Sequence, residues 1–163
     1  MLIRAATPGD ITTITDIYAH HVRTGVGSFE IEPPDAVEMR TRYDAVTAQG
    51  LPYLVAEDDG VIGYAYAAPY RTRAAYRHTL EHSVYVHPDH TGRGVGRTLM
   101  QALIPLCAAW GCRELIAGIG GGASNAASVG LHTALGFQPS GILRRVGYKF
   151  DTWQDVMFMQ LTL

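Results

Sequence analysis

The 163-residue chain lacks the features that mark membrane proteins, exported proteins and disulfide-stabilised proteins. No apolar run approaches the roughly 20 residues that a membrane-spanning helix needs. The N-terminus has no apolar segment typical of a signal peptide. The two cysteines, Cys107 and Cys112, are too few for a disulfide framework and match neither a zinc site nor a CxxC redox motif. We therefore expect a cytoplasmic protein that does not act on membranes.

The chain also lacks a large excess of charge of either sign. Thirteen Lys and Arg residues stand against fifteen Asp and Glu residues, which gives a net charge of −2. Binding of nucleic acid through a basic face is therefore not expected. The seven histidines show no spacing typical of a metal site, so no bound metal is predicted. With 47% hydrophobic residues, the chain has the composition of one folded domain spanning residues 1–163.

The hydrophobic periodicity predicts an α/β protein. Helical spacing predicts helices over 11–24, 35–49, 97–110 and 125–135. Alternating or apolar runs bounded by turn residues predict strands over 2–6, 53–57, 61–66, 80–86, 113–119, 142–148 and 153–161. This order of elements indicates a mixed sheet with helices on its faces.

Glycine alternates with other residues in the turn between the strand over 80–86 and the following helix. Gly92, Gly94 and Gly96 lack Cβ atoms, so successive backbone amides can point into one concavity at a helix N-terminus. A Walker A loop is excluded because no Lys follows, and the third glycine comes one residue too early for a dinucleotide fingerprint. A plain tight turn remains the alternative, but the neighbouring Arg93 and Arg97 favour a phosphate or pyrophosphate site.

At this turn the chain resembles the GNAT superfamily of acetyl-CoA-dependent N-acetyltransferases, which carries a Q/R-x-x-G-x-G/A motif after its central strand. Thr91 stands where the family has Gln or Arg. The resemblance extends over the order of elements and implies a single-domain GNAT fold with a mixed, mostly antiparallel sheet. It also implies a homodimer and a turn that holds the coenzyme A pyrophosphate. The residues given this role are Thr91, Gly92, Arg93, Gly94, Val95, Gly96 and Arg97.

Four further segments resemble one branch, the phosphinothricin and methionine sulfoximine or sulfone N-acetyltransferases. These segments lie within 81–86, 125–132, 135–137 and 147–160. The branch implies acetyl transfer from acetyl-CoA to the α-amine of a small amino-acid-like substrate, with both substrates bound together. Because an α-amine is largely protonated near neutral pH, such a reaction needs a base, and the departing thiolate needs a proton.

Glu81 is the candidate base. In the predicted strand, Glu81, Ser83 and Tyr85 share one face, whereas His82 lies on the other. Partial burial of a carboxyl raises its pKa and makes it a better base. The spacing alone leaves an exposed carboxylate equally open, and the resemblance assigns the catalytic role. The resemblance likewise makes His132 the donor to the thiolate, where local packing or capping is the alternative.

The resemblance also assigns binding roles. Asn125 is a candidate helix cap and a contact to the pantetheine arm. The backbone of Val84, Tyr85 and Val86 would pair with the pantetheine amides like an added strand. Arg71 and Arg73 match the anionic groups of an amino-acid-like substrate, although a solvated basic loop is nearly as good an interpretation. The other expected substrate-binding residues are Phe29, Glu30, His82 and Ser83.

Two other functions remain open at the level of sequence. One is acetylation of a macromolecular acceptor such as a protein N-terminus, which usually needs an open groove. The other is a non-catalytic sensor that binds coenzyme A, which would keep the glycine turn without the base or the acid. The paired arginines weigh against the first alternative, and the presence of Glu81 and His132 weighs against the second.

Overall fold

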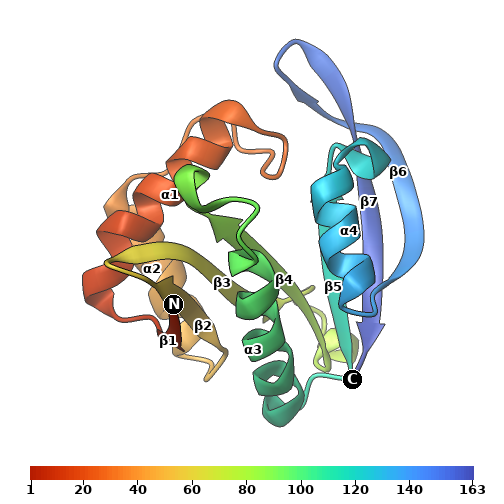
Figure 1. Cartoon of the computed structure of the whole chain (residues 1–163). Helices are drawn as coiled ribbons and strands as arrows, with labels where there is room; N and C mark the ends of the chain where they lie inside the picture. The colour runs from red at the N-terminus through yellow and green to blue at the C-terminus, as the bar shows by residue number, and fades with distance from the viewer.

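The computed structural model describes all 163 residues and contains one seven-stranded sheet (Figure 1). The strand order is β1-β2-β3-β4-β5-β7-β6, and every neighbouring pair is antiparallel except β4 and β5. The strands are β1 (Leu2–Ala5), β2 (Tyr53–Glu57), β3 (Val61–Pro69), β4 (Thr79–Val86), β5 (Glu114–Gly120), β6 (Gln138–Lys149) and β7 (Thr152–Thr162). This architecture confirms the expected fold class, a mixed and mostly antiparallel sheet with flanking helices.

Four α-helices cover the sheet. They are α1 (Ile11–Thr24), α2 (Ala36–Thr47), α3 (Val95–Trp110) and α4 (Ala126–Ala134). Short 3₁₀ turns lie at Pro8–Asp10, Ala74–Tyr76, Pro88–His90 and Gly122–Ser124. Asn125 caps α4 by accepting a hydrogen bond from the Ser128 amide at 3.3 Å, which confirms the predicted cap. None of these helices combines the length and the hydropathy needed to cross a membrane.

Side chains of β4 alternate between the two layers of the protein, as the sequence predicted. Leu80 and His82 are buried on the side of α3 and α4, where the His82 ring stacks on His132 of α4. Tyr85 faces the opposite layer, with its ring centroid 5.1 Å from that of Tyr18 in α1. The two layers of helices therefore enclose different parts of the same strand.

The parallel pairing of β4 with β5 is short, and this decides where the site forms. It covers three residue pairs and ends at Glu81 opposite Ile116. Beyond that point β4 continues along β3 and β5 continues along β7, so the two strands diverge (Figure 1). The divergence leaves the last part of β4 without a neighbour on its β5 side.

The β6–β7 hairpin projects beyond the body of the molecule (Figure 1). Its strands are longer than predicted, because β6 begins four residues earlier than the expected start at Ile142. The hairpin carries several large apolar side chains in exposed positions: Ile142, Leu143, Val146, Tyr148, Phe150 and Trp153. An exposed apolar group of this kind is typical of an interaction surface.

Candidate active site

A cleft of about 740 Å³ lies between the diverging strands β4 and β5. The end of α1, the turn before α3 and the inner face of α4 complete its walls. Its lining brings together twelve of the residues predicted from the sequence. They are His82, Ser83, Val84, Tyr85, Val86, Thr91, Gly92, Gly94, Val95, Gly96, Asn125 and His132.

Along this cleft, one edge of β4 has no neighbouring strand to bind its backbone amide and carbonyl groups. Val84, Tyr85 and Val86 pair with β3, while their β5-facing edge has no strand partner. The carbonyl oxygen of Val86 is bonded to His21 of α1, whose Nε2 lies 2.8 Å away. An unpaired strand edge can bind an extended ligand through main-chain hydrogen bonds.

The glycine turn forms the far end of the cleft. Gly92 and Gly94 have φ values of 73° and 81°, a backbone conformation that L side chains rarely adopt. Gly94 immediately precedes α3, so the first free amides of that helix face the cleft lining. Arg93 and Arg97 are exposed beside the turn and do not line the cleft. An anion bound at this turn would therefore contact chiefly backbone amides.

Glu81 lies where the two strands part. It does not line the cleft itself, but its carboxylate lies against Gly118 of β5, which does. A Cβ atom at position 118 would stand 2.9 Å from Oε1 of Glu81, so glycine keeps space for the carboxylate. Burial raises the pKa of Glu81, and the positive charge of Arg71 partly opposes that increase. These are the surroundings of a carboxylate suited to accept a proton.

Arg71 and Arg73 line a second cavity, of about 390 Å³, together with Thr72 and Tyr76. The Arg71 guanidinium lies 5.9 Å from the ring centroid of Tyr76. Arg71 is exposed and forms no ion pair with an acidic side chain. The two arginines predicted to bind an anion therefore lie outside the main cleft. Arg71 is near enough to Glu81 for its charge to affect that carboxyl group.

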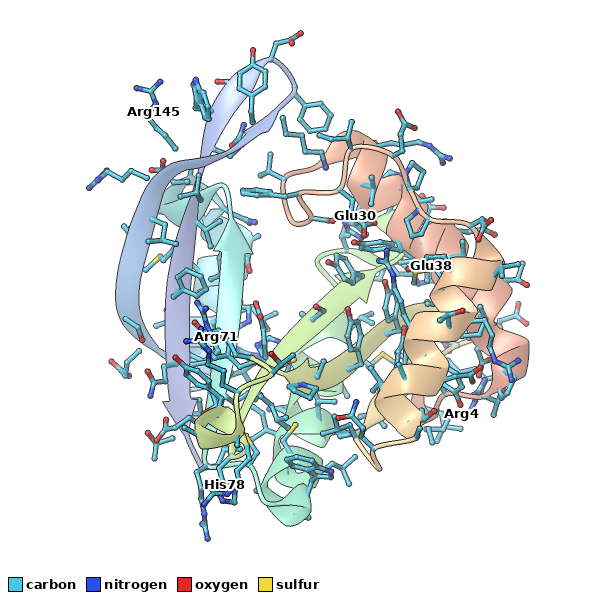
Figure 2. The ribbon with its side chains drawn as sticks, turned by 180° about the vertical axis from the view of Figure 1, so that it is seen from behind. Arg4, Glu30, Glu38, Arg71, His78 and Arg145 are labelled. Atoms are coloured by element: carbon cyan, nitrogen blue, oxygen red, sulfur yellow. The ribbon has the colours of Figure 1, made fainter.

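The loop after α1 places Phe29 against β6 and Glu30 against α2. The Phe29 ring packs so closely on Gly147 of β6 that a Cβ atom at position 147 would collide with it. Oε1 of Glu30 forms a 2.7 Å ion pair with the Arg42 guanidinium, and Glu30 lies beside α2 in Figure 2. Its other oxygen, Oε2, is buried without a hydrogen-bond partner. Neither Phe29 nor Glu30 lines the main cleft.

His82 and His132 form a buried pair on the opposite side of β4 from Glu81. Their Nε2 atoms are 3.2 Å apart, and their ring centroids are 5.0 Å apart. The Phe137 ring packs edge-on against both imidazoles. Burial lowers the pKa of both residues, that of His82 to about 3, so both are neutral near pH 7. His82 therefore lies on the side of His132 and not beside Glu81.

The cleft also contains residues that the sequence reasoning missed. His21, Val26, Gly118, Gly120 and Ser128 contribute to its lining. Val26 reaches β5 because glycine stands at position 120, where any Cβ atom would collide with the Val26 carbonyl oxygen. Spacing in the sequence gives no signal for these contacts, since they join segments that are far apart along the chain.

Comparison with known proteins agrees with this geometry. Residues 14–137 match the model of the acetyltransferase (GNAT) family. The chain belongs to this family. It is 54% identical to the phosphinothricin N-acetyltransferase of Alcaligenes faecalis, over 99% of this chain and 82% of the relative. It is 41% identical to the L-methionine sulfoximine/L-methionine sulfone acetyltransferase of Salmonella typhimurium, over 100% of this chain and 95% of the relative.

A solved member of the GNAT family has the same fold. The crystal structure of a GNAT superfamily phosphinothricin acetyltransferase from Sinorhizobium meliloti, in complex with AcCoA, is similar with a TM-score of 0.95. The two chains are 41% identical, and the alignment covers 99% of this chain and 88% of that chain. The resemblance to the phosphinothricin and methionine sulfoximine branch, first seen in the sequence motifs, is therefore confirmed.

Proposed function

We propose that this protein is an acetyl-CoA-dependent N-acetyltransferase for the α-amine of a small amino-acid-like substrate. Phosphinothricin, methionine sulfoximine and methionine sulfone are the substrate types supported by the relatives. The observation that carries the proposal is the divergence of β4 and β5 immediately after Glu81. It leaves an open strand edge between a partly buried carboxylate and a glycine-rich helix N-terminus.

The residues of the cleft fit coenzyme A. The amides of the turn from Thr91 to Arg97 would hold the pyrophosphate, which favours a helix N-terminus. The edge from Val84 to Val86 and the side chain of Asn125 would bind the pantetheine amides. The bound coenzyme supplies an acetyl thioester, so no covalent intermediate on the protein is needed.

On the acceptor side, Glu81 would take the proton of the substrate ammonium, directly or through water. Its raised pKa increases its basicity. Arg71 and Arg73 would bind the carboxylate or phosphinate of the substrate, because guanidinium groups match these anions. Phe29, Glu30 and Ser83 would complete the acceptor pocket, in which the unpartnered Oε2 of Glu30 can accept a hydrogen bond.

On the side of the leaving group, His132 would stabilise the departing thiolate. Its imidazole lines the cleft and is neutral, so it acts through hydrogen bonds and not as a charged acid. His82 contacts His132, so we assign His82 to this side rather than to substrate binding. In this proposal, one face of β4 carries the group that takes the amine proton, and the other face carries the group that stabilises the thiolate.

A thiol-release assay with acetyl-CoA tests the proposal. The acceptor panel contains methionine sulfone, methionine sulfoximine, phosphinothricin, the ordinary amino acids and short peptides. We expect the highest kcat/KM with the first three compounds. Faster turnover of peptides would instead support the protein-acceptor alternative, and binding of acetyl-CoA without turnover of any amine would support the sensor alternative.

We further propose that the protein works as a cytoplasmic homodimer and that residues 1–163 form one domain. The exposed apolar side chains of the β6–β7 hairpin fit a second copy of this chain. Analytical ultracentrifugation would test the dimer, with Leu143→Asp as the variant expected to dissociate it. Leu143 is about half exposed, so the substitution leaves the core intact.

A further inference from the structure

Three side chains lie in series between the buried core and the cleft. Nε2 of His82 lies 3.2 Å from Nε2 of His132, and Nδ1 of His132 lies 3.4 Å from Oγ of Ser128. Ser128 is one turn before His132 on α4 and contributes to the cleft lining. Neither a sequence motif nor the proposed function gives Ser128 a role in catalysis.

The direction of each hydrogen bond in this series follows from the atoms involved. Nδ1 of His132 lies 2.7 Å from the backbone carbonyl oxygen of Ser128, which can only accept. Nδ1 therefore carries the proton, and the neutral imidazole of His132 has a bare Nε2. His82 must then donate from its own Nε2. Because Nδ1 of His132 carries a proton, it cannot accept a hydrogen bond from Oγ of Ser128, 3.4 Å away, and the hydroxyl is free to donate its own proton into the cleft.

We propose that the hydroxyl of Ser128 donates a hydrogen bond to the coenzyme sulfur, and that His82 and His132 are positioning residues that polarise this hydroxyl. All three donors point in one direction, from the core toward the cleft. Hydrogen bonds aligned in this way strengthen one another in a low-dielectric interior. This inference rests on the proposed function, because it requires an acetyl thioester in the cleft.

Packing alone does not explain why a histidine is buried at position 82. Nδ1 of His82 is buried without a hydrogen-bond partner. Such an unsatisfied group is unfavourable, and an apolar residue of similar size would avoid it. A role in donating to His132 explains why an imidazole occupies this position beneath the cleft. No proton has to leave either imidazole, so the series acts by stabilising negative charge on sulfur as the bond to the acetyl group breaks.

Steady-state kinetics with matched variants test the proposal. Ser128→Ala should lower kcat by about 10²-fold, the usual effect of losing one donor to a developing anion, with little change in KM for acetyl-CoA. His82→Leu should lower kcat about 10-fold, because the polarising donor is lost and the volume is kept. His82→Gln retains an N–H donor of similar reach and should recover most of the activity. Thr133→Ala, on the exposed side of α4, is the control for general disturbance of the helix.

A double-mutant cycle separates a shared action from two independent effects. If His82 acts through Ser128, the double variant should be about as slow as Ser128→Ala alone. Fully multiplicative losses, or a His82→Leu variant with normal kcat, would overturn the proposal. A wild-type protein that acetylates no amine would overturn the proposed function as well, so the two failures are distinguishable.

Nitrogen NMR of histidine-labelled protein gives a readout that does not depend on activity. We expect His132 to carry its proton on Nδ1 and His82 to carry its proton on Nε2. In the His82→Leu variant, the nitrogen chemical shift of His132 Nε2 should move toward the value of an imidazole nitrogen that accepts no hydrogen bond. The rest of the spectrum should remain that of the folded protein. A proton found on Nε2 of His132 in the wild-type protein would contradict the proposed direction of the series.

Discussion

The ammonium group of Lys149 on β6 lies 2.7 Å from the carbonyl oxygen of Ser28 and 2.9 Å from that of Gly25. Lys149 is the only lysine in the chain, and just 4% of it is exposed. It joins the projecting hairpin to the end of α1 and to the loop that follows. Together with the Phe29 ring against Gly147, this contact fixes the loop that carries Glu30. The acceptor pocket that we propose therefore depends on the hairpin.

Lys149→Met is expected to loosen this loop while keeping most of the side-chain volume. The two carbonyl oxygens would lose their buried donor, which costs about 1–3 kcal/mol of unfolding free energy. KM for the amino-acid substrate should rise more than KM for acetyl-CoA, because the part of the loop that carries Phe29 and Glu30 lies outside the main cleft, which only residues 25–27 of the loop line. Denaturant unfolding and initial-rate kinetics measure both effects. Equal increases in the two KM values would contradict a specific link to the acceptor pocket.

Glu81→Gln is expected to lower kcat by about 10²–10⁴-fold, the range for loss of a general base. The amide has nearly the shape of the carboxylate, so space beside Gly118 is preserved. The dissociation constant for acetyl-CoA, measured by calorimetry, should stay close to that of the wild-type protein. A variant with unchanged turnover would remove Glu81 from the mechanism.

The pH dependence of kcat/KM should reflect the surroundings of Glu81. Burial raises its pKa, and the base works only when deprotonated, so activity should fall as the pH decreases through that raised value. Arg71 holds the pKa down by its positive charge. Arg71→Met should therefore move the acid limb of the profile to higher pH, beyond any general loss of substrate affinity. A shift of this limb to lower pH would exclude the assigned interaction.

Gly118→Ala should displace the carboxylate of Glu81, the proposed base, without changing residue 81 itself. The added Cβ would stand 2.9 Å from Oε1, so the end of the side chain must move. Misplacement of a catalytic group by about 1 Å can cost 10²-fold in rate. Gly130→Ala on α4 is the matched control, since no atom lies within 4 Å of its added Cβ. A similar small effect of both substitutions on kcat would argue against a steric role for Gly118.

Local patterns in the sequence predicted the elements well but not the contacts between distant segments. Alternation along 80–86 gave the correct faces for Glu81 and His82, because a strand has a period of two. The contact between His82 and His132 joins residues 50 positions apart, on a strand and a helix. It depends on how α4 packs on the sheet, which no local periodicity encodes.

The same distinction explains the substrate-side residues. The composition of the loop at Arg71 and Arg73 predicted anion binding, but the structure places this pair in a cavity separate from the main cleft. Phe29 was predicted by resemblance alone, and its partner Gly147 is more than a hundred residues away in the chain. Lys149 lies in a segment that resembles the branch, but its buried contact was not predicted, because a single lysine in a strand is usually exposed to solvent.

Gly94→Ala tests whether the turn binds the coenzyme through its backbone. The residue has a φ of 81°, so alanine costs about 1–2 kcal/mol in that conformation although its Cβ would meet no protein atom. Gly111→Ala is the control with the same kind of strain, since Gly111 has a φ of 110° at the other end of α3. Both variants should lose similar unfolding free energy, and only Gly94→Ala should weaken acetyl-CoA binding in calorimetry. If both bound acetyl-CoA as tightly as the wild-type protein, the amides of this turn would not be the pyrophosphate site.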